Sequence, residues 1–263
     1  MERKLGILSE CLNGVPSVEA LKLMKDAGFN CFMTDRYTFD EAKPIIEAGN
    51  ALGMTCESIH TPFGGINEMW NYGMGYLTVF NGIKTAIDTA AALEVPCVVV
   101  HVSSGWNAPQ INDLGLSRYD EIVNYAGEKG VKIALENLRK VGNLAYLIDR
   151  YEKLPQVGFC YDFGHEHCYT KTVRWMDHFL DKVLTTHIHD NFGRPDDPKG
   201  DGDLHLMPFE GNIDYARCMS DINKYGYKGA LVLELKNTRY ENMTNEEFLA
   251  TAYERLKKIS ELG

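Results

Sequence analysis

Acidic and imidazole side chains recur along this chain at or near the ends of short apolar runs. If these ends meet in a folded core, several carboxylates are buried together, which costs many kcal/mol unless a cation neutralises them. Mixed oxygen and nitrogen donors favour Zn²⁺, Mn²⁺, Co²⁺ or Fe²⁺ over Mg²⁺ or Ca²⁺. The sequence therefore predicts a divalent metal site. The residues at the run ends are His60, His101, Glu136, Asp162, His187, His189 and Glu234.

Three short-range pairs sharpen this prediction. The first joins a carboxylate at a strand end to an imidazole one turn later. The second places two imidazoles on one face of a strand, because side chains alternate along a strand. The third lies in the longest irregular stretch, residues 191–211, and long loops in compact domains are usually functional or mobile. In order, the pairs are Asp162/His165, His187/His189 and Asp203/His205.

The elements that must position these residues alternate regularly. Eight apolar runs, interpreted as strands, are separated by amphipathic stretches interpreted as helices, which predicts parallel strands with right-handed crossovers. At 263 residues a single (β/α)₈ TIM barrel, with residues 1–263 as one domain, fits better than a doubly wound sheet. Its catalytic groups would lie at the carboxyl ends of the strands. The expected strands are 5–10, 31–35, 55–60, 97–103, 132–137, 157–162, 184–190 and 230–235.

Helix starts carry their own signals. Ser17 is expected to cap a helix over residues 18–27, and Thr38 with Glu41, like Thr244 with Glu247, has the spacing of a capping box.

Composition limits the function classes. Lys and Arg total 27 against 37 Asp and Glu, a formal charge of −10, which disfavours a nucleic-acid partner. No apolar run is long enough for a signal peptide or a membrane span. The seven cysteines form no C-x-x-C pair and are expected as reduced thiols, so we expect a cytoplasmic protein. No glycine-rich phosphate loop is evident, so no nucleotide cofactor is expected.

The ordered motifs resemble one family across essentially the whole chain. They are Ser-Ile-His60-Thr-Pro-Phe, Val-Val-His101, Ala-Leu-Glu136-Asn, Tyr-Asp162-Phe-Gly-His165, His187-Ile-His189-Asp-Asn, Asp203-Leu-His205 and Leu-Glu234-Leu. Together they resemble the xylose isomerase-like TIM-barrel superfamily. That superfamily includes sugar and sugar-phosphate isomerases and epimerases and the type IV AP endonucleases (AP endonuclease family 2).

The resemblance implies two forms of metal site. In the epimerase form one ion is held by Glu136, Asp162, one histidine of the seventh strand and Glu234. The His-x-x-Asp spacing favours His187 as that ligand, with His189 binding substrate or supporting a ligand, although the two roles could be reversed.

In the endonuclease form further ions are added. His60 and His101 would contribute to a second ion, and His165, Asp203 and His205 to a third. All of these positions are filled in this sequence.

The resemblance also implies a reaction, and the residues of the neighbouring loops suggest how a substrate would be held. The metal would stabilise an enediolate, with Glu136 and Glu234 as the acid–base pair on opposite faces of the reacting carbon. Trp70 and Trp106 would stack on a sugar, or else pack within loops. Arg194 would bind a phosphate or hydroxyl, or else be a solvated loop charge.

Three functions follow. The preferred one is a divalent-metal-dependent isomerase or epimerase acting on a small sugar, sugar phosphate or related polyol or keto compound. The alternative is a metallohydrolase or lyase of the endonuclease IV-like type with a multinuclear centre, and the third is a non-catalytic metal or sugar binder. The expected partner is a small sugar-like molecule, without nucleic acid or membrane, and the resemblance is compatible with a homo-oligomer.

Overall fold

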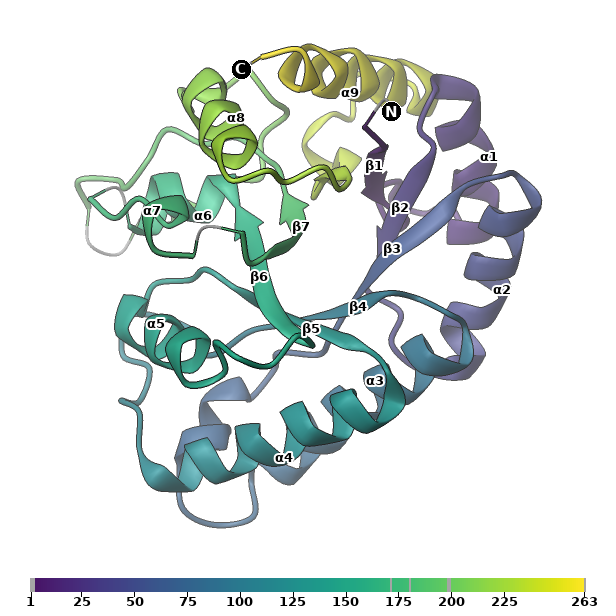
Figure 1. The fold of residues 1–263 in the computed structure, drawn as a ribbon. Coiled ribbons are helices and arrows are strands. Elements are labelled where there is room, and N and C mark those ends of the chain that lie inside the picture. The colour runs from purple at the N-terminus through teal and green to yellow at the C-terminus, as the bar shows by residue number, and fades with distance from the viewer. Residues whose placement is uncertain (1–2, 171, 180, 198–199, 263) are drawn as a thin grey trace.

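The computed structural model describes residues 3–170, 172–179, 181–197 and 200–262. Its strands form one parallel eight-stranded sheet in the order β7-β6-β5-β4-β3-β2-β1-β8, curled at the centre of the molecule (Figure 1). The strands are β1 (Leu5–Leu8), β2 (Cys31–Thr34), β3 (Thr55–His60), β4 (Cys97–Val100), β5 (Lys132–Glu136), β6 (Val157–Asp162), β7 (Val183–His187) and β8 (Leu231–Leu233).

The first and last strands of this order approach one another beyond their regular ends. Ile188 bridges in parallel to Leu233, its N–H donates to the carbonyl of Val232 at 2.9 Å, and the Glu234 N–H donates to the Ile188 carbonyl at 3.0 Å. These bonds bring the sheet to near closure. The fold is the TIM barrel that the alternation of runs predicted.

Helices surround the strands on the outside (Figure 1). They are α1 (Ser17–Ala27), α2 (Phe39–Ala51), α3 (Leu77–Ala92), α4 (Asp113–Lys129), α5 (Val141–Arg150), α6 (Phe163–Tyr169), α7 (Met176–Phe179), α8 (Tyr215–Lys224) and α9 (Asn245–Ser260), with 3₁₀ turns η1 (Ile66–Trp70) and η2 (Asn237–Arg239).

Of the three predicted helix caps, one is confirmed in full, one in part, and one is wrong. The Thr244–Glu247 capping box is confirmed, with both reciprocal bonds present. Thr38 is the N-cap of α2, but its hydroxyl donates to the Glu41 carboxylate at 2.6 Å and the described residues show no cap bond to backbone. The expectation for Ser17 is wrong, because Pro16 occupies the cap and Ser17 is already helical. A proline there has its φ fixed at a value suited to a helix start.

The barrel interior explains why the ligand candidates point where they do. Three small side chains on neighbouring strands, Val99, Ala134 and Cys160, form a buried cluster of their own, separate from the large apolar core. Because alternate residues of a strand share a face, the residues two positions further along point the same way. Those residues are His101, Glu136 and Asp162.

All seven cysteines are buried and free, as the sequence predicted. Within the described residues, the helices are too short or too polar to serve as a membrane span.

Candidate metal centre

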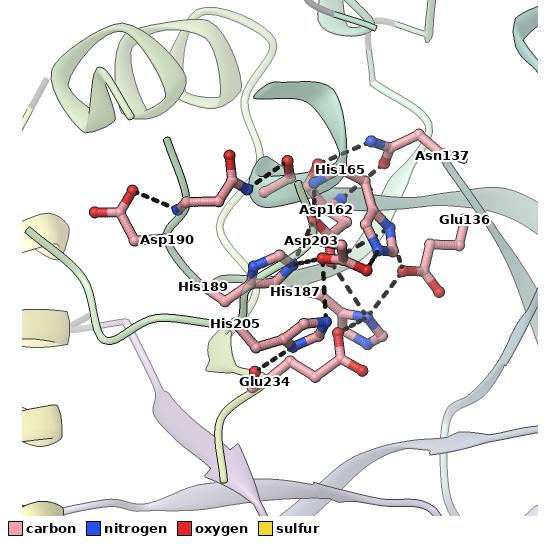
Figure 2. Close-up of polar contacts among 12 residues, drawn as sticks. Glu136, Asn137, Asp162, His165, His187, His189, Asp190, Asp203, His205 and Glu234 are labelled. Atoms are coloured by element: carbon pink, nitrogen blue, oxygen red, sulfur yellow. Dashed lines mark hydrogen bonds and ion pairs between the residues drawn. The ribbon is translucent and has the colours of Figure 1, made fainter. Parts of the chain in front are cut away.

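The carboxylate of Glu136, at the end of β5, lies at the right-hand side of the polar cluster in Figure 2, with contacts drawn to His165 and His187. Its side chain is 1% exposed and four imidazoles surround it. His60 Nε2 and His101 Nε2 lie 3.3 and 3.0 Å from Oε2. His165 Nδ1 and His187 Nδ1 lie 3.1 and 3.4 Å from Oε1. Imidazoles from four other segments of the chain thus meet at one buried acid.

Glu136, Asp162, His187 and Glu234 form a first group whose donor atoms all lie within 4.8 Å of one another. His187 Nδ1 is 3.4 Å from Glu234 Oε2 and 4.0 Å from Asp162 Oδ2. These four residues match the set that the family resemblance implied for a single ion, with His187 in the place of the seventh-strand histidine. Of the two seventh-strand histidines, His187 is the one in this group.

A second group consists of His60, His101 and Glu136 and obeys the same limit. Phe63 stacks on the His101 ring with centroids 4.5 Å apart and meets His60 edge-on. Phe63 thus covers part of the second group.

His165, His189, Asp203 and His205 form a third group. Asp203 Oδ1 lies 3.2 Å from His205 Nε2 and 3.6 Å from His189 Nε2, and its Oδ2 lies 3.2 Å from His165 Nε2. The His189 and His205 rings stack with centroids 3.9 Å apart. His189, expected at the substrate or behind a ligand, therefore lies among candidate ligands.

Asp162 is fixed by its neighbours at the end of β6. Its Oδ1 accepts a 2.6 Å bond from the His165 backbone N–H and so caps α6. The Asn137 side chain holds the Asp162 backbone from both sides, with two bonds of 2.8 Å. Oδ2 is left free to face the cluster. Neither Asn137 nor helix α6 was identified from the sequence, although an Asp three residues before His165 has the spacing of a cap.

Asp190 organises the long loop that brings Asp203 and His205 into the site. Its carboxylate accepts bonds from the Phe209 N–H at 2.8 Å and the Ile213 N–H at 3.3 Å, and its backbone pairs with Leu206 in an antiparallel bridge. The sequence shows an acid directly after His189, but it does not show that this acid anchors the loop, because Phe209 and Ile213 lie about 20 residues further along the chain.

Gly164 lets His189 occupy its position. A Cβ built on Gly164 would lie 2.0 Å from Cε1 of the His189 ring, closer than any real contact. The ring is fully buried, so the third group requires glycine here.

The charges in the cluster depend on one another. Burial opposes ionisation of Glu136, yet His187 and His101 outweigh it and hold its pKa well below the usual range. Burial also opposes protonation of His205, but Asp203 raises the pKa of that imidazole to about 9. The pKa values of His60, His165 and His187 are also raised against burial by neighbouring acidic groups, so protons on these imidazoles would offset the carboxylates. A metal would take the place of such protons, because histidine binds metal in its neutral form.

The donor set fits a divalent cation. Several buried polar atoms of the cluster have no hydrogen-bond partner among the described residues, and such atoms are costly unless something else satisfies them. A cation held by mixed oxygen and nitrogen donors would do so. The atoms are Asp162 Oδ2, His165 Nδ1, His187 Nε2, His189 Nδ1 and Nε2, Asp203 Oδ1 and Glu234 Oε2.

The residues expected at the substrate are spread apart. The Trp70 side chain is 2% exposed, its ring centroid lies 5.1 Å from that of Tyr119, and its indole N–H donates to the carbonyl of Val102. Trp70 therefore packs in the interior, and the expectation that it stacks on a sugar is wrong. Trp106 is 38% exposed, and the Arg194 guanidinium lies 4.3 Å from its ring centroid. These two residues stay candidates at the rim.

Two cavities open onto the cluster. One of about 170 Å³ is lined by His60, His101, His165, Asp203, His205 and Glu234 together with rim residues. A neighbouring cavity of about 300 Å³ shares Asp203, His205 and Glu234 with it. A small molecule entering either cavity would contact the carboxylate of Glu234.

The chain belongs to the xylose isomerase-like TIM barrel family, whose model matches residues 21–259. It is 33% identical over 172 residues to an uncharacterised protein of Sinorhizobium fredii, covering 60% of this chain and 53% of the relative. It is 25% identical over 189 residues to an inosose isomerase of Halalkalibacterium halodurans, covering 68% and 66%. The chain thus spans about half to two thirds of the length of these curated relatives.

Among solved structures, that of the IOLI protein with a bound zinc atom superposes with a TM-score of 0.77. The two chains are 20% identical and each is covered to 98%, so this likeness shows the fold.

Proposed function

We propose that the chain is a divalent-metal-dependent isomerase or epimerase of a small sugar-like substrate. The observation that carries this proposal is the first group, in which Glu136, Asp162, His187 and Glu234 converge with unpartnered buried atoms beside a cavity. An isomerase among the relatives and a zinc atom in a structure of the same fold support it.

The four residues of the first group would hold the ion. A divalent ion bound there would stabilise negative charge that develops on substrate oxygens when a proton leaves the neighbouring carbon. The mixed donors suit Mn²⁺, Zn²⁺, Co²⁺ or Fe²⁺.

The two glutamates differ in what they can do. Glu234 lines both cavities, its side chain is 20% exposed and its Oε2 has no hydrogen-bond partner in the described residues. It can therefore reach a substrate carbon and move a proton. Glu136 is enclosed by imidazoles and lines neither cavity, so its acid–base role stays a prediction and its position favours holding the ion.

The test is proton exchange. Metal-loaded protein is incubated in D₂O with a panel of ketoses, ketose phosphates and inososes, and deuterium at the carbon next to the carbonyl is followed by NMR. We expect exchange with at least one compound and its loss after chelation, with recovery on adding metal back. Undiminished exchange after exhaustive chelation would rule the metal out.

The second and third groups favour one other function, a multinuclear metallohydrolase. Their donors also meet within 4.8 Å, and the shared Glu136 links two of the three groups. Against a DNA substrate stands the formal charge of −10. Cleavage of an abasic-site duplex without deuterium exchange would favour this function, and the reverse result the isomerase.

A further inference from the structure

Arg139 lines the 170 Å³ cavity together with the candidate ligands, and it is the single lysine or arginine among the described residues of that lining. It follows Glu136 by three residues in the segment between β5 and α5. Its guanidinium lies over the ring of Tyr169, 3.7 Å from Cζ to the ring centroid, and 5.7 Å from that of Trp106. These rings fix its orientation at the cavity wall.

Among the described residues, the guanidinium of Arg139 has one distant direct carboxylate contact and otherwise reaches Asp203 only through the hydroxyl of Tyr169, which donates to Asp203 at 2.9 Å. The Arg139 side chain is 20% exposed, yet its only direct carboxylate among the described residues is that of Asp201, at 3.9 Å and 71% exposed. Nη2 donates to the neutral hydroxyl of Tyr169. Nε is buried and has no hydrogen-bond partner in the part of the chain that is described. A buried donor of a charged group left unsatisfied is unfavourable, so Nε is free to bind an acceptor that the described residues do not supply.

Two other arginines show how hydrogen-bond acceptors are supplied to a guanidinium elsewhere in this chain. Arg118 is buried, and its N–H groups donate to four backbone carbonyls at 2.9–3.3 Å. Arg150 donates to both oxygens of Asp120 at 2.8 and 2.6 Å. Arg139 has neither arrangement, and it faces the cavity instead.

We propose that Arg139 binds an oxyanion of the substrate, a carboxylate or a phosphate, so that the substrate of this site is an anionic sugar derivative. The inference rests on the proposed function for the reacting end of that molecule. Guanidinium N–H groups match carboxylate and phosphate oxygens in geometry and charge. A neutral hydroxyl would satisfy Nε but leave the charge unmatched. Because Arg139 and Glu234 line the same small cavity, the oxyanion lies within a few bonds of the reacting carbon.

The experiment measures binding by calorimetry on the manganese-loaded protein, with inorganic phosphate, acetate and the neutral polyol xylitol as probes. Arg139→Gln is compared with wild type and with Arg150→Gln, a matched loss of an arginine outside the site. We expect Arg139→Gln to weaken binding of one anion about 10- to 100-fold, as for a lost charged hydrogen bond, and to leave xylitol unchanged. Whether phosphate or acetate shows the effect identifies the group.

Anion affinities that are equal in wild type and Arg139→Gln, or that fall equally in Arg150→Gln, would overturn the inference, as would a wild type that binds neither anion. If Arg139→Gln does not fold, Arg139→Lys, which lacks the Nε donor, serves for the same comparison. Failure of this inference and of the proposed function can be told apart. Deuterium exchange into neutral ketoses that survives Arg139→Gln contradicts only the anionic substrate. Anion binding that depends on Arg139, without exchange on any compound, contradicts only the isomerase.

Discussion

The contact between Gly164 and His189 yields a prediction with an internal control. Gly164 and Gly142 are each the second residue of a helix, α6 and α5. Replacing a helical glycine by alanine gains about 0.5–1 kcal/mol when nothing opposes it. At Gly142 a Cβ meets no atom within 4 Å, whereas at Gly164 it would lie 2.0 Å from the imidazole of His189.

Overpacking of this kind costs about 1–3 kcal/mol. We expect Gly142→Ala to raise the melting temperature and Gly164→Ala to lower it, with about 2–4 °C for each kcal/mol in a chain of this size. The His189 ring has no space to retreat, because it stacks on His205 and is fully buried. Gly164→Ala should therefore also weaken metal binding by the third group.

The assay combines thermal unfolding with metal content by elemental analysis after dialysis. The two variants share the change in helix propensity, so their difference isolates the contact with His189. If Gly164→Ala matches Gly142→Ala in both melting temperature and bound metal, the arrangement around Gly164 is not as described.

The remaining predictions concern the ligands, the core and a cap. Glu234→Gln should reduce deuterium exchange about 10²- to 10⁴-fold with the fold retained by circular dichroism, and near-normal exchange would reject its proton-transfer role. Asp203→Ala combined with His205→Ala should keep the metal of the first group and most of the exchange, whereas loss of exchange together with metal would point to a multinuclear centre. Trp70→Phe should destabilise the fold by about 1–3 kcal/mol in chemical denaturation through its lost N–H bond, without changing the KM for substrate, and a changed KM at unchanged stability would contradict its core position. Thr244→Ala should cost about 1 kcal/mol in the same assay, and no loss would mean that the capping box is not stabilising.

The barrel and the ligand strands could be predicted because they are encoded locally. Apolar runs ending in an acid or imidazole mark both a strand and the direction of its last side chain, as at Glu136 and Asp162. Helix α6 was missed because it has only seven residues, Phe163–Tyr169, and shows little periodicity. Its start depends on a cap from the preceding strand end.

Other parts of the site depend on contacts between distant segments. The direction of the Trp70 ring is set by packing on Tyr119, and the use of Asp190 is set by a loop that returns to it. Arg139 is notable because few acceptors contact its guanidinium among the described residues, and a linear sequence does not show which contacts a side chain lacks. For these residues the type is visible in the sequence, while the role requires the fold.

The origin of the donors differs among the three groups. Those of the first two come from strand ends or the residues directly after them, while Asp203 and His205 are supplied by a separate excursion of the chain anchored through Asp190. Replacing only residues 191–211 would keep Ile188, whose bonds bring the barrel to near closure, and the first group, and would alter only the third group. In this architecture one candidate metal group depends on a single loop, so the number of such groups could change with that loop while the strands stay the same.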